Sequence, residues 1–276
     1  MQDTIFYNRS LLERIIETAS VQTVFQPICS VRKQMIAGLE ALSRGVDPDS
    51  GERLSPLGLF ELARQEGLLL DFDRICRHQA LKAFSEIQER YPQLALFLNL
   101  DAGIIDSNRR KIGMLDQVTE AMGIDPGRVV IELLESRVND MGSLADFVHD
   151  RKQSGFLIGL DDLGAGHSNL SRVPMVQPNV LKIDQGIVSG LEDDHYKREV
   201  FDICVLLAHR IGAVVVAEGI ETESQALEAV ERGADLLQGY YLSMPQVFSG
   251  KLMDGALART RGVAARYREM AVHKAH

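Results

Sequence analysis

The stretch FLIGLDD, residues 156–162, is an apolar run of strand length that ends in two adjacent aspartates. Further runs of this kind are VQTVFQPI (21–28), IAGLEAL (36–42), LALFLNL (94–100), RVVIELL (128–134), NVLKID (179–184) and AVVVAEG (213–219), with an eighth around 236–238. They are apolar throughout and do not alternate with polar residues, which is typical of strands buried on both faces of a parallel sheet.

Helical patterns lie between these runs, at 57–66, 73–90, 195–211 and 223–232. Gly212 and Gly233 follow two of them as helix stops, and Thr222 precedes the last as a plausible N-cap. Strands that alternate with helices predict parallel βα units. Because the 276-residue length fits one such barrel, we expect an α/β protein with a TIM-like (β/α)8 barrel.

The sequence changes character after residue 247. Residues 248–276 are rich in Ala and Arg, and an apolar stripe recurs every three or four residues at Met253, Ala256, Thr260, Val263, Tyr267 and Met270. We therefore expect a barrel over 1–247 and an additional C-terminal helix over 248–276 that lies on the barrel. A helix that pairs two subunits, or that leads into a further domain, is the alternative.

Composition narrows the class of protein. The net charge of −9 gives no basic excess, so we expect no binding to duplex nucleic acid. Cys29, Cys76 and Cys204 are far apart and form no CxxC pair, which indicates buried thiols in a reducing compartment. The N-terminus has no apolar signal region and no segment reaches 18 apolar residues, so we expect a cytoplasmic protein.

Polar side chains recur near the end of the apolar runs. They are Glu40, Asn99, Glu132, Asp161, Asp162, Lys182, Asp184, Glu218 and Glu221. In a parallel barrel these ends meet at one rim, where the carboxylates would repel one another unless cations were bound. Oxygen ligands without His or Cys favour Mg²⁺ or Mn²⁺ over zinc. Adjacent aspartates suit two ions, a recurring device for phosphodiester hydrolysis.

Eight ordered motifs then resemble those of the EAL family of bacterial cyclic-di-GMP phosphodiesterases. They are FQPI (25–28), EALSR (40–44), LNL (98–100), IELLES (131–136), LDDLGAGHSNL (160–170), LKID (181–184), AEGIET (217–222) and QGYYLSMP (238–245). The matches span nearly the whole expected barrel. The loop at 163–169 departs from the family pattern at Leu163, Ala165, His167 and Asn169.

The resemblance implies a role for each matching residue. Metal ligands would be Glu40, Asn99, Glu132 and Asp161 for one ion and Asp161, Asp162 and Glu218 for the other. Lys182 would orient the attacking water, and Arg44 would contact a substrate phosphate. Gln26, Leu42, Asp184, Glu221 and Gln238 would surround the nucleotide. Glu135 resembles the glutamate that braces the loop after the fifth strand.

The function implied by the resemblance is hydrolysis of cyclic-di-GMP to linear pGpG with two Mg²⁺ or Mn²⁺ ions, inhibited by Ca²⁺. A homodimer and a sensor domain on a longer chain are common in the family. The alternatives are a receptor that binds cyclic-di-GMP in the same pocket without turnover, and a scaffold. Receptors of this family typically lose metal ligands, and none is missing here, which favours the enzyme.

Overall fold

The computed structural model describes residues 8–105, 114–134, 140–164 and 169–274. The strands are β1 (Val21–Ser30), β2 (Met35–Val46), β3 (Arg53–Leu54), β4 (Ala95–Asp101), β5 (Val129–Leu134), β6 (Leu157–Leu163), β7 (Val180–Ile183), β8 (Val214–Ala217) and β9 (Leu236–Leu237). The α-helices are α1 (Arg9–Thr18), α2 (Pro56–Gln65), α3 (Leu69–Arg90), α5 (Met114–Ala121), α6 (Met141–Gln153), α7 (Val173–Val176), α8 (Gln185–Val188), α9 (His195–Arg210), α10 (Glu223–Glu231) and α11 (Gly250–Lys274). Short 3₁₀ turns cover Ala102–Ile104, Pro126–Arg128 and Asn169–Arg172.

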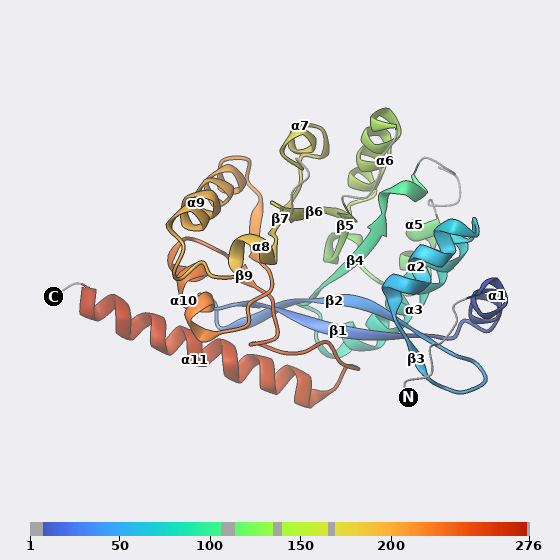
Figure 1. The fold of residues 1–276 in the computed structure, drawn as a ribbon, viewed down its shortest axis with the longest axis horizontal. Coiled ribbons are helices and arrows are strands. Elements are labelled where there is room, and N and C mark those ends of the chain that lie inside the picture. The colour runs from blue at the N-terminus through green and yellow to red at the C-terminus, as the bar shows by residue number, and fades with distance from the viewer. Residues whose placement is uncertain (1–7, 106–113, 135–139, 165–168, 275–276) are drawn as a thin grey trace.

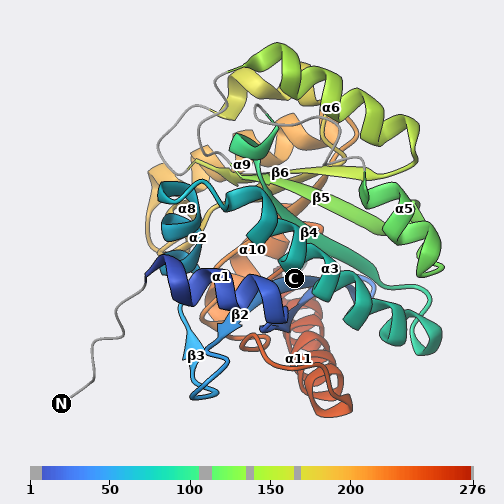
Figure 2. The ribbon, with the colours of Figure 1, turned by 90° about the vertical axis from the view of Figure 1, so that its right-hand side faces the viewer.

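Eight strands of the described chain close into a barrel in the order β1, β9, β8, β7, β6, β5, β4 and β2, with β2 pairing back onto β1. The two-residue β3 extends the edge of β2. Helices surround the strands (Figure 1), and α3 lies against β4 and α5 (Figure 2). The expected TIM-like (β/α)8 barrel with an additional C-terminal helix is confirmed. Within the described residues, no helix combines the length and the apolar character needed to cross a membrane.

The expectation of parallel strands throughout is wrong for β1. This strand runs antiparallel to both of its neighbours, β2 and β9. Only residues 31–34 separate β1 from β2, which is too short for the crossover that a parallel connection requires. The resulting hairpin sets Gln26 opposite Glu40 in the register of the two strands.

The barrel interior has an apolar layer below its C-terminal rim. Ile28, Phe97, Val130, Val180 and Val216 pack into one buried cluster. They come from strands that are not all neighbours, so these side chains meet across the interior. Gly38 makes room for Phe97, because a Cβ at Gly38 would lie 2.6 Å from the Phe97 ring.

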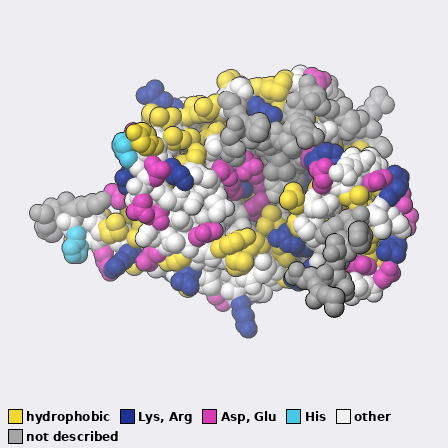
Figure 3. Space-filling model, in the orientation of Figure 1, with side chains coloured by type: hydrophobic (Ala, Val, Ile, Leu, Met, Phe, Trp, Pro, Cys, Tyr) yellow, Lys and Arg dark blue, Asp and Glu magenta, His cyan; other side chains and the backbone are white. Residues whose placement is uncertain are grey.

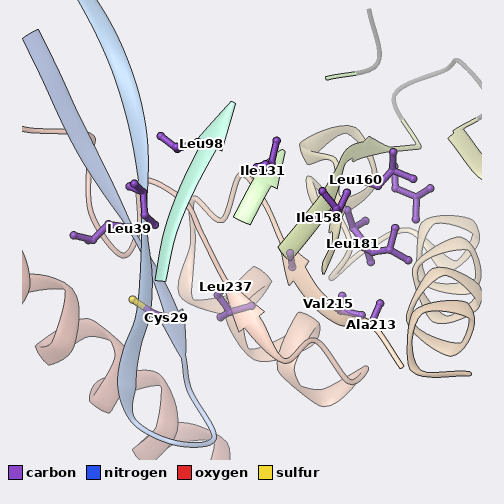
Figure 4. Close-up of a cluster of buried hydrophobic side chains, with 14 of the residues drawn as sticks. Cys29, Leu39, Leu98, Ile131, Ile158, Leu160, Leu181, Ala213, Val215 and Leu237 are labelled. Carbon is purple, nitrogen blue, oxygen red and sulfur yellow. The ribbon is translucent and has the colours of Figure 1, made fainter. Parts of the chain in front are cut away.

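Alternate residues of the barrel strands point outward. Labelled examples in Figure 4 are Leu39, Leu98, Ile131, Ile158, Leu160, Leu181 and Val215, all members of the large cluster between the sheet and the helices. Successive strand residues face opposite sides, so both faces of the sheet are apolar. This explains why the strands read as continuous apolar runs.

Helix α11 covers the outside of the β1–β2 hairpin, which has no crossover helix of its own. It contacts β1, β2 and α10 and runs beneath the hairpin in Figure 1. Ala256, Thr260 and Val263 are fully buried against the barrel, whereas Val272 near the helix end is exposed. The apolar stripe of the C-terminal segment therefore faces the barrel.

Candidate metal and nucleotide site

A polar layer lies directly above the apolar layer of the barrel interior. Inward positions recur every second residue along a strand, so a polar residue two positions after an inward residue also faces inward. The pairs are Glu40 after Gly38, Asn99 after Phe97, Glu132 after Val130, Asp161 after Gly159, Lys182 after Val180, Glu218 after Val216 and Gln238 after Leu236. On the antiparallel β1 the order is reversed, and Gln26 precedes Ile28. Acidic side chains gather in a recess in the middle of the face shown in Figure 3.

Lys182 lies at the centre of this layer and is 1% exposed. Its Nζ lies 2.6 Å from Glu218 Oε1 and 2.8 Å from Glu132 Oε1. The carboxylates of Asp161 and Glu40 follow at 3.5 and 3.7 Å. Burial by itself would lower the pKa of Lys182, but these carboxylates together raise it well above its ordinary value. The side chain therefore remains a cation.

One lysine does not satisfy every oxygen of the layer. Neither oxygen of the fully buried Glu132 accepts a hydrogen bond of suitable geometry from any described residue, although Lys182 lies beside it. Asn99 donates from Nδ2 to Glu40 Oε1 at 2.7 Å, and its own Oδ1 is buried without a donor among the described residues. Burial raises the pKa of Glu132 well above its usual range, against the effect of Lys182. Buried oxygens in this state are costly unless another group binds them.

Asp161 and Asp162 both reach the rim because the backbone departs from regular strand geometry. Asp162 has a φ of 56°, in the left-handed region, and the β6–β7 register shifts between Leu160 and Leu163. The irregularity lets two consecutive side chains point the same way. The Asp162 N–H donates to Asp161 Oδ1 at 3.0 Å, and burial together with the Asp161 charge raises the pKa of Asp162 to about 6.

These oxygens fit divalent cations. Carboxylate oxygens of Asp161, Asp162 and Glu218 lie within 4.8 Å of one another. Asn99 Oδ1 and Glu132 Oε2, which accept no hydrogen bond from the described residues, occur in the same layer. The donor set holds only oxygen, which hard divalent ions prefer. The structure thus brings together all six residues that the sequence predicts as metal ligands.

Two cavities open beside the acidic layer. The larger, of about 640 Å³, is lined by Arg44 and Asn99 and extends to α2 and α3. The smaller, of about 310 Å³, is lined by Gln26, Asp184, Glu221 and Gln238. Both include Glu40, Leu42 and Asp162. Each residue predicted to surround the nucleotide therefore lines one of the two cavities.

Gln238 ties the antiparallel strand to the acidic layer. Its Nε2 donates to Gln26 Oε1 at 3.1 Å and to Glu40 Oε2, while Gln26 donates to the carbonyl of Ser243 at 3.1 Å. One oxygen of Glu40 is thus held by Gln238 and the other by Asn99. These amides fix the orientation of the Glu40 carboxylate.

The sequence analysis missed two ion pairs in the wall of the larger cavity. Arg64 pairs with Asp101, and Arg77 pairs with Asp73 within α3. Asp101 follows Asn99 by two residues on β4, which was a usable signal for a side chain near the rim. Gln185, which lines the smaller cavity, was also missed. Glu135, Ala165 and His167 lie outside the described residues.

Comparison with known proteins places these features in a family. Residues 8–245 match the family model described as the EAL domain. The signaling protein YkoW of Bacillus subtilis is 28% identical over 88% of this chain and 30% of its own length. The probable cyclic di-GMP phosphodiesterase PdeB of Escherichia coli is 28% identical over 84% of this chain and 44% of its own length. This chain thus spans less than half the length of either relative.

A solved structure gives the same fold. The Bacillus subtilis YkuI protein, with an EAL domain, was crystallised in complex with substrate c-di-GMP and calcium. It superposes with a TM-score of 0.77 at 28% identity, over 95% of this chain and 66% of that chain. The complex is consistent with binding of divalent metals by EAL domains.

Proposed function

This chain belongs to the EAL-domain family, and we propose that it is a metal-dependent phosphodiesterase that hydrolyses cyclic-di-GMP to linear 5′-pGpG. One observation carries the proposal: the complete set of inward oxygen ligands, including the buried Asn99 Oδ1 and Glu132 Oε2, which accept no hydrogen bond from the described residues, next to cavities lined by Arg44 and amides. Relatives named as probable cyclic-di-GMP phosphodiesterases support the substrate.

We assign one Mg²⁺ or Mn²⁺ ion to Glu40, Asn99, Glu132 and Asp161, and a second to Asp161, Asp162 and Glu218. When bound, such ions lower the pKa of a water molecule and neutralise the charge that develops on the phosphate. Asn99 and Gln238 hold Glu40 in place before any ion arrives. This preorganisation reduces the rearrangement needed on binding.

Side chains of this protein then orient the attacking water and the substrate. Lys182 Nζ, fixed among four carboxylates, orients the attacking water. The water oxygen bonds to phosphorus, the bond from phosphorus to O3′ breaks, and a proton from the water ends on O3′. Arg44 binds a phosphate, and Leu42 packs against the nucleotide between the two cavities. Gln26, Asp184, Glu221 and Gln238 bind the nucleotide in the smaller cavity.

A non-catalytic cyclic-di-GMP receptor is the second candidate, because the same cavities could bind the nucleotide without turnover. The complete ligand set favours the enzyme. The test incubates the protein with cyclic-di-GMP and Mg²⁺ or Mn²⁺ and separates the products by chromatography, with Glu132→Gln as the inactive control. Formation of pGpG by the wild type alone supports the enzyme. Retained binding without pGpG under both metals supports the receptor.

We further propose a cytoplasmic homodimer that includes α9. Along this helix Tyr196, Val200, Ile203 and Leu206 follow one another at spacings of four, three and three, and Ile203 is 64% exposed. Such a stripe on one helix face favours contact with another apolar surface. Light scattering should give a dimer for the wild type and a monomer for Ile203→Asp. A monomeric wild type would contradict this proposal.

A sensor domain on a longer chain would supply the regulatory input.

A further inference from the structure

We propose that Gln185 is a positioning residue that sets the base specificity of the smaller cavity, by holding the Glu221 carboxylate where it accepts hydrogen bonds from guanine. The inference rests on the proposed function, since it takes a cyclic guanine dinucleotide as the ligand. It adds a residue and a selection mechanism that the sequence motifs did not assign.

The first observation is a hydrogen bond between two loops. Gln185 Nε2, just after the end of β7, donates to Glu221 Oε1, just after β8, at 3.1 Å. Both residues line the smaller cavity together with Asp184 and Gln238. The contact therefore joins two separate walls of the same cavity.

The second observation is that the backbone of Glu221 is already fixed. Its N–H donates at 2.8 Å to Gln225 Oε1, the oxygen that also accepts from the Thr222 N–H in the capping box that begins α10. The remaining freedom of Glu221 lies in its exposed side chain. A single donor on one carboxylate oxygen can therefore decide where that side chain points.

The third observation is that the chain makes room for this contact at Gly219. Gly219 has a φ of 64°, and a Cβ there would lie 2.4 Å from Gln185 Cγ and 2.5 Å from Gln185 Cβ. The Cβ and Cγ of Gln185 thus lie directly against the backbone of Gly219, and the Gln185 amide extends from there to Glu221. A side chain at position 219 would displace Gln185 from this path.

The chemistry of guanine matches this arrangement. Its N1–H and its exocyclic N2 amino group are adjacent donors, which one carboxylate can accept side by side. Adenine presents an unprotonated N1 at the same place, which a carboxylate repels. Gln185 is a neutral donor, so it orients the Glu221 carboxylate without neutralising its charge. Bidentate pairs of this kind discriminate between bases by about 5- to 150-fold.

The experiment compares Gln185→Ala with the wild type on two substrates, cyclic-di-GMP and its hypoxanthine analogue, which lacks both exocyclic amino groups. We expect the wild type to prefer cyclic-di-GMP by about tenfold or more in kcat/KM. For Gln185→Ala we expect KM for cyclic-di-GMP to rise about tenfold, kcat to change less than about twofold, and the preference to shrink. Glu221→Gln should also reduce the preference for cyclic-di-GMP over the hypoxanthine analogue. The double variant Gln185→Ala/Glu221→Gln should reduce this preference no further than either single variant does.

Gln88→Ala is the matched control. This half-buried glutamine donates to the carbonyl of Gly123, outside both cavities, and its loss should leave KM and the preference unchanged. Equal rises in KM for both substrates in Gln185→Ala would assign Gln185 a purely structural role and overturn the inference. An unchanged preference would also overturn it.

A second measurement separates this inference from the proposed function. If the wild type forms no pGpG, the dissociation constants of both ligands are measured by calorimetry in Ca²⁺. The same loss of guanine preference in Gln185→Ala then supports the inference although the proposed catalysis fails. Turnover by the wild type together with an unaltered preference in the variant would leave the enzyme proposal intact and reject the role of Gln185.

Discussion

Lys182 Nζ lies 2.8 Å from Glu132 Oε1, and both side chains are almost completely buried. Removal of one member of a buried pair leaves the other charge uncompensated, at a cost of about 3–5 kcal/mol. The two members are not equivalent here. Glu132 is one of four carboxylates around a single lysine, whereas Lys182 is the cation that all four share.

The first prediction follows from this asymmetry. Lys182→Met should lower the melting temperature of the metal-free protein by about 10 °C, because it leaves the carboxylates to repel one another. Glu132→Gln should lower it much less, since three carboxylates still neutralise Lys182. Thermal unfolding in EDTA measures both. A larger loss for Glu132→Gln than for Lys182→Met would contradict the central position of Lys182.

The second prediction concerns divalent ions. Mg²⁺ or Mn²⁺ at about a hundred times its dissociation constant should stabilise the protein by about 2.7 kcal/mol for each occupied site, because the ions bind the folded state. Ca²⁺ should also raise the melting temperature but should inhibit turnover, since it tolerates irregular coordination at longer bonds. Melting curves and product assays run in parallel test this. Full activity in Ca²⁺ would refute the metal assignment.

The third prediction separates phosphate binding from metal binding. Arg44→Ala should raise KM for cyclic-di-GMP about 10- to 100-fold, because a hydrogen bond to a charged group contributes about 1.5–3 kcal/mol. The rise in melting temperature with Mg²⁺ should be unchanged. Arg53→Ala, an exposed arginine on β3, is the control that should affect neither quantity. Loss of the Mg²⁺ effect in Arg44→Ala would mean that Arg44 supports the metal site instead.

Much of the acidic layer could be predicted from the sequence because inward-facing side chains recur every second residue along a strand. A residue two positions after an inward apolar residue also faces inward, so the ends of the apolar runs indicated Glu132, Lys182 and Glu218 together. Hydrophobic continuity also identified the strands, since both faces of the sheet are covered. The positions of the strands and of these inward residues follow from regular strand geometry, so they can be predicted without knowledge of tertiary contacts.

Other features depend on strand direction, backbone conformation or long-range contacts, which the pattern of apolar and polar residues does not indicate. The antiparallel direction of β1 follows from the short link at 31–34, which the apolar pattern does not reveal. The shared direction of Asp161 and Asp162 needs the left-handed backbone at Asp162. The Arg64–Asp101 pair joins α2 to the end of β4 across 37 positions of sequence, so only the folded chain brings it together.

The fourth prediction concerns the cysteines. Burial raises the pKa of Cys29 to about 11 and that of Cys76 to about 12, so both thiols stay protonated and shielded in the folded protein. A dithionitrobenzoate assay at pH 8 should detect neither thiol until a denaturant is added. The raised pKa values also stabilise the folded state below the ordinary thiol pKa, and this stability should be lost as the pH rises from about 9 toward 11. Urea unfolding at pH 7 and pH 10 should therefore show a smaller loss of unfolding free energy in Cys29→Ala/Cys76→Ala than in the wild type. An equal loss in both proteins would assign the pH dependence to other groups.

The fifth prediction concerns α11. Thr260 and Val263 are fully buried against the barrel, and Thr260 lies close enough to Cys29 of β1 to hydrogen-bond its thiol. Truncation after residue 247 would expose the outer face of the β1–β2 hairpin, so we expect the truncated chain to aggregate although it retains every predicted metal ligand. Val263→Asp should destabilise the 276-residue chain by several kcal/mol, because it buries an unpaired charge. The same substitution at the exposed Val272 should cost less than about 0.5 kcal/mol. Urea unfolding of both variants gives the comparison. A truncated chain that stays in solution with the stability of the 276-residue chain would show that the barrel folds without α11.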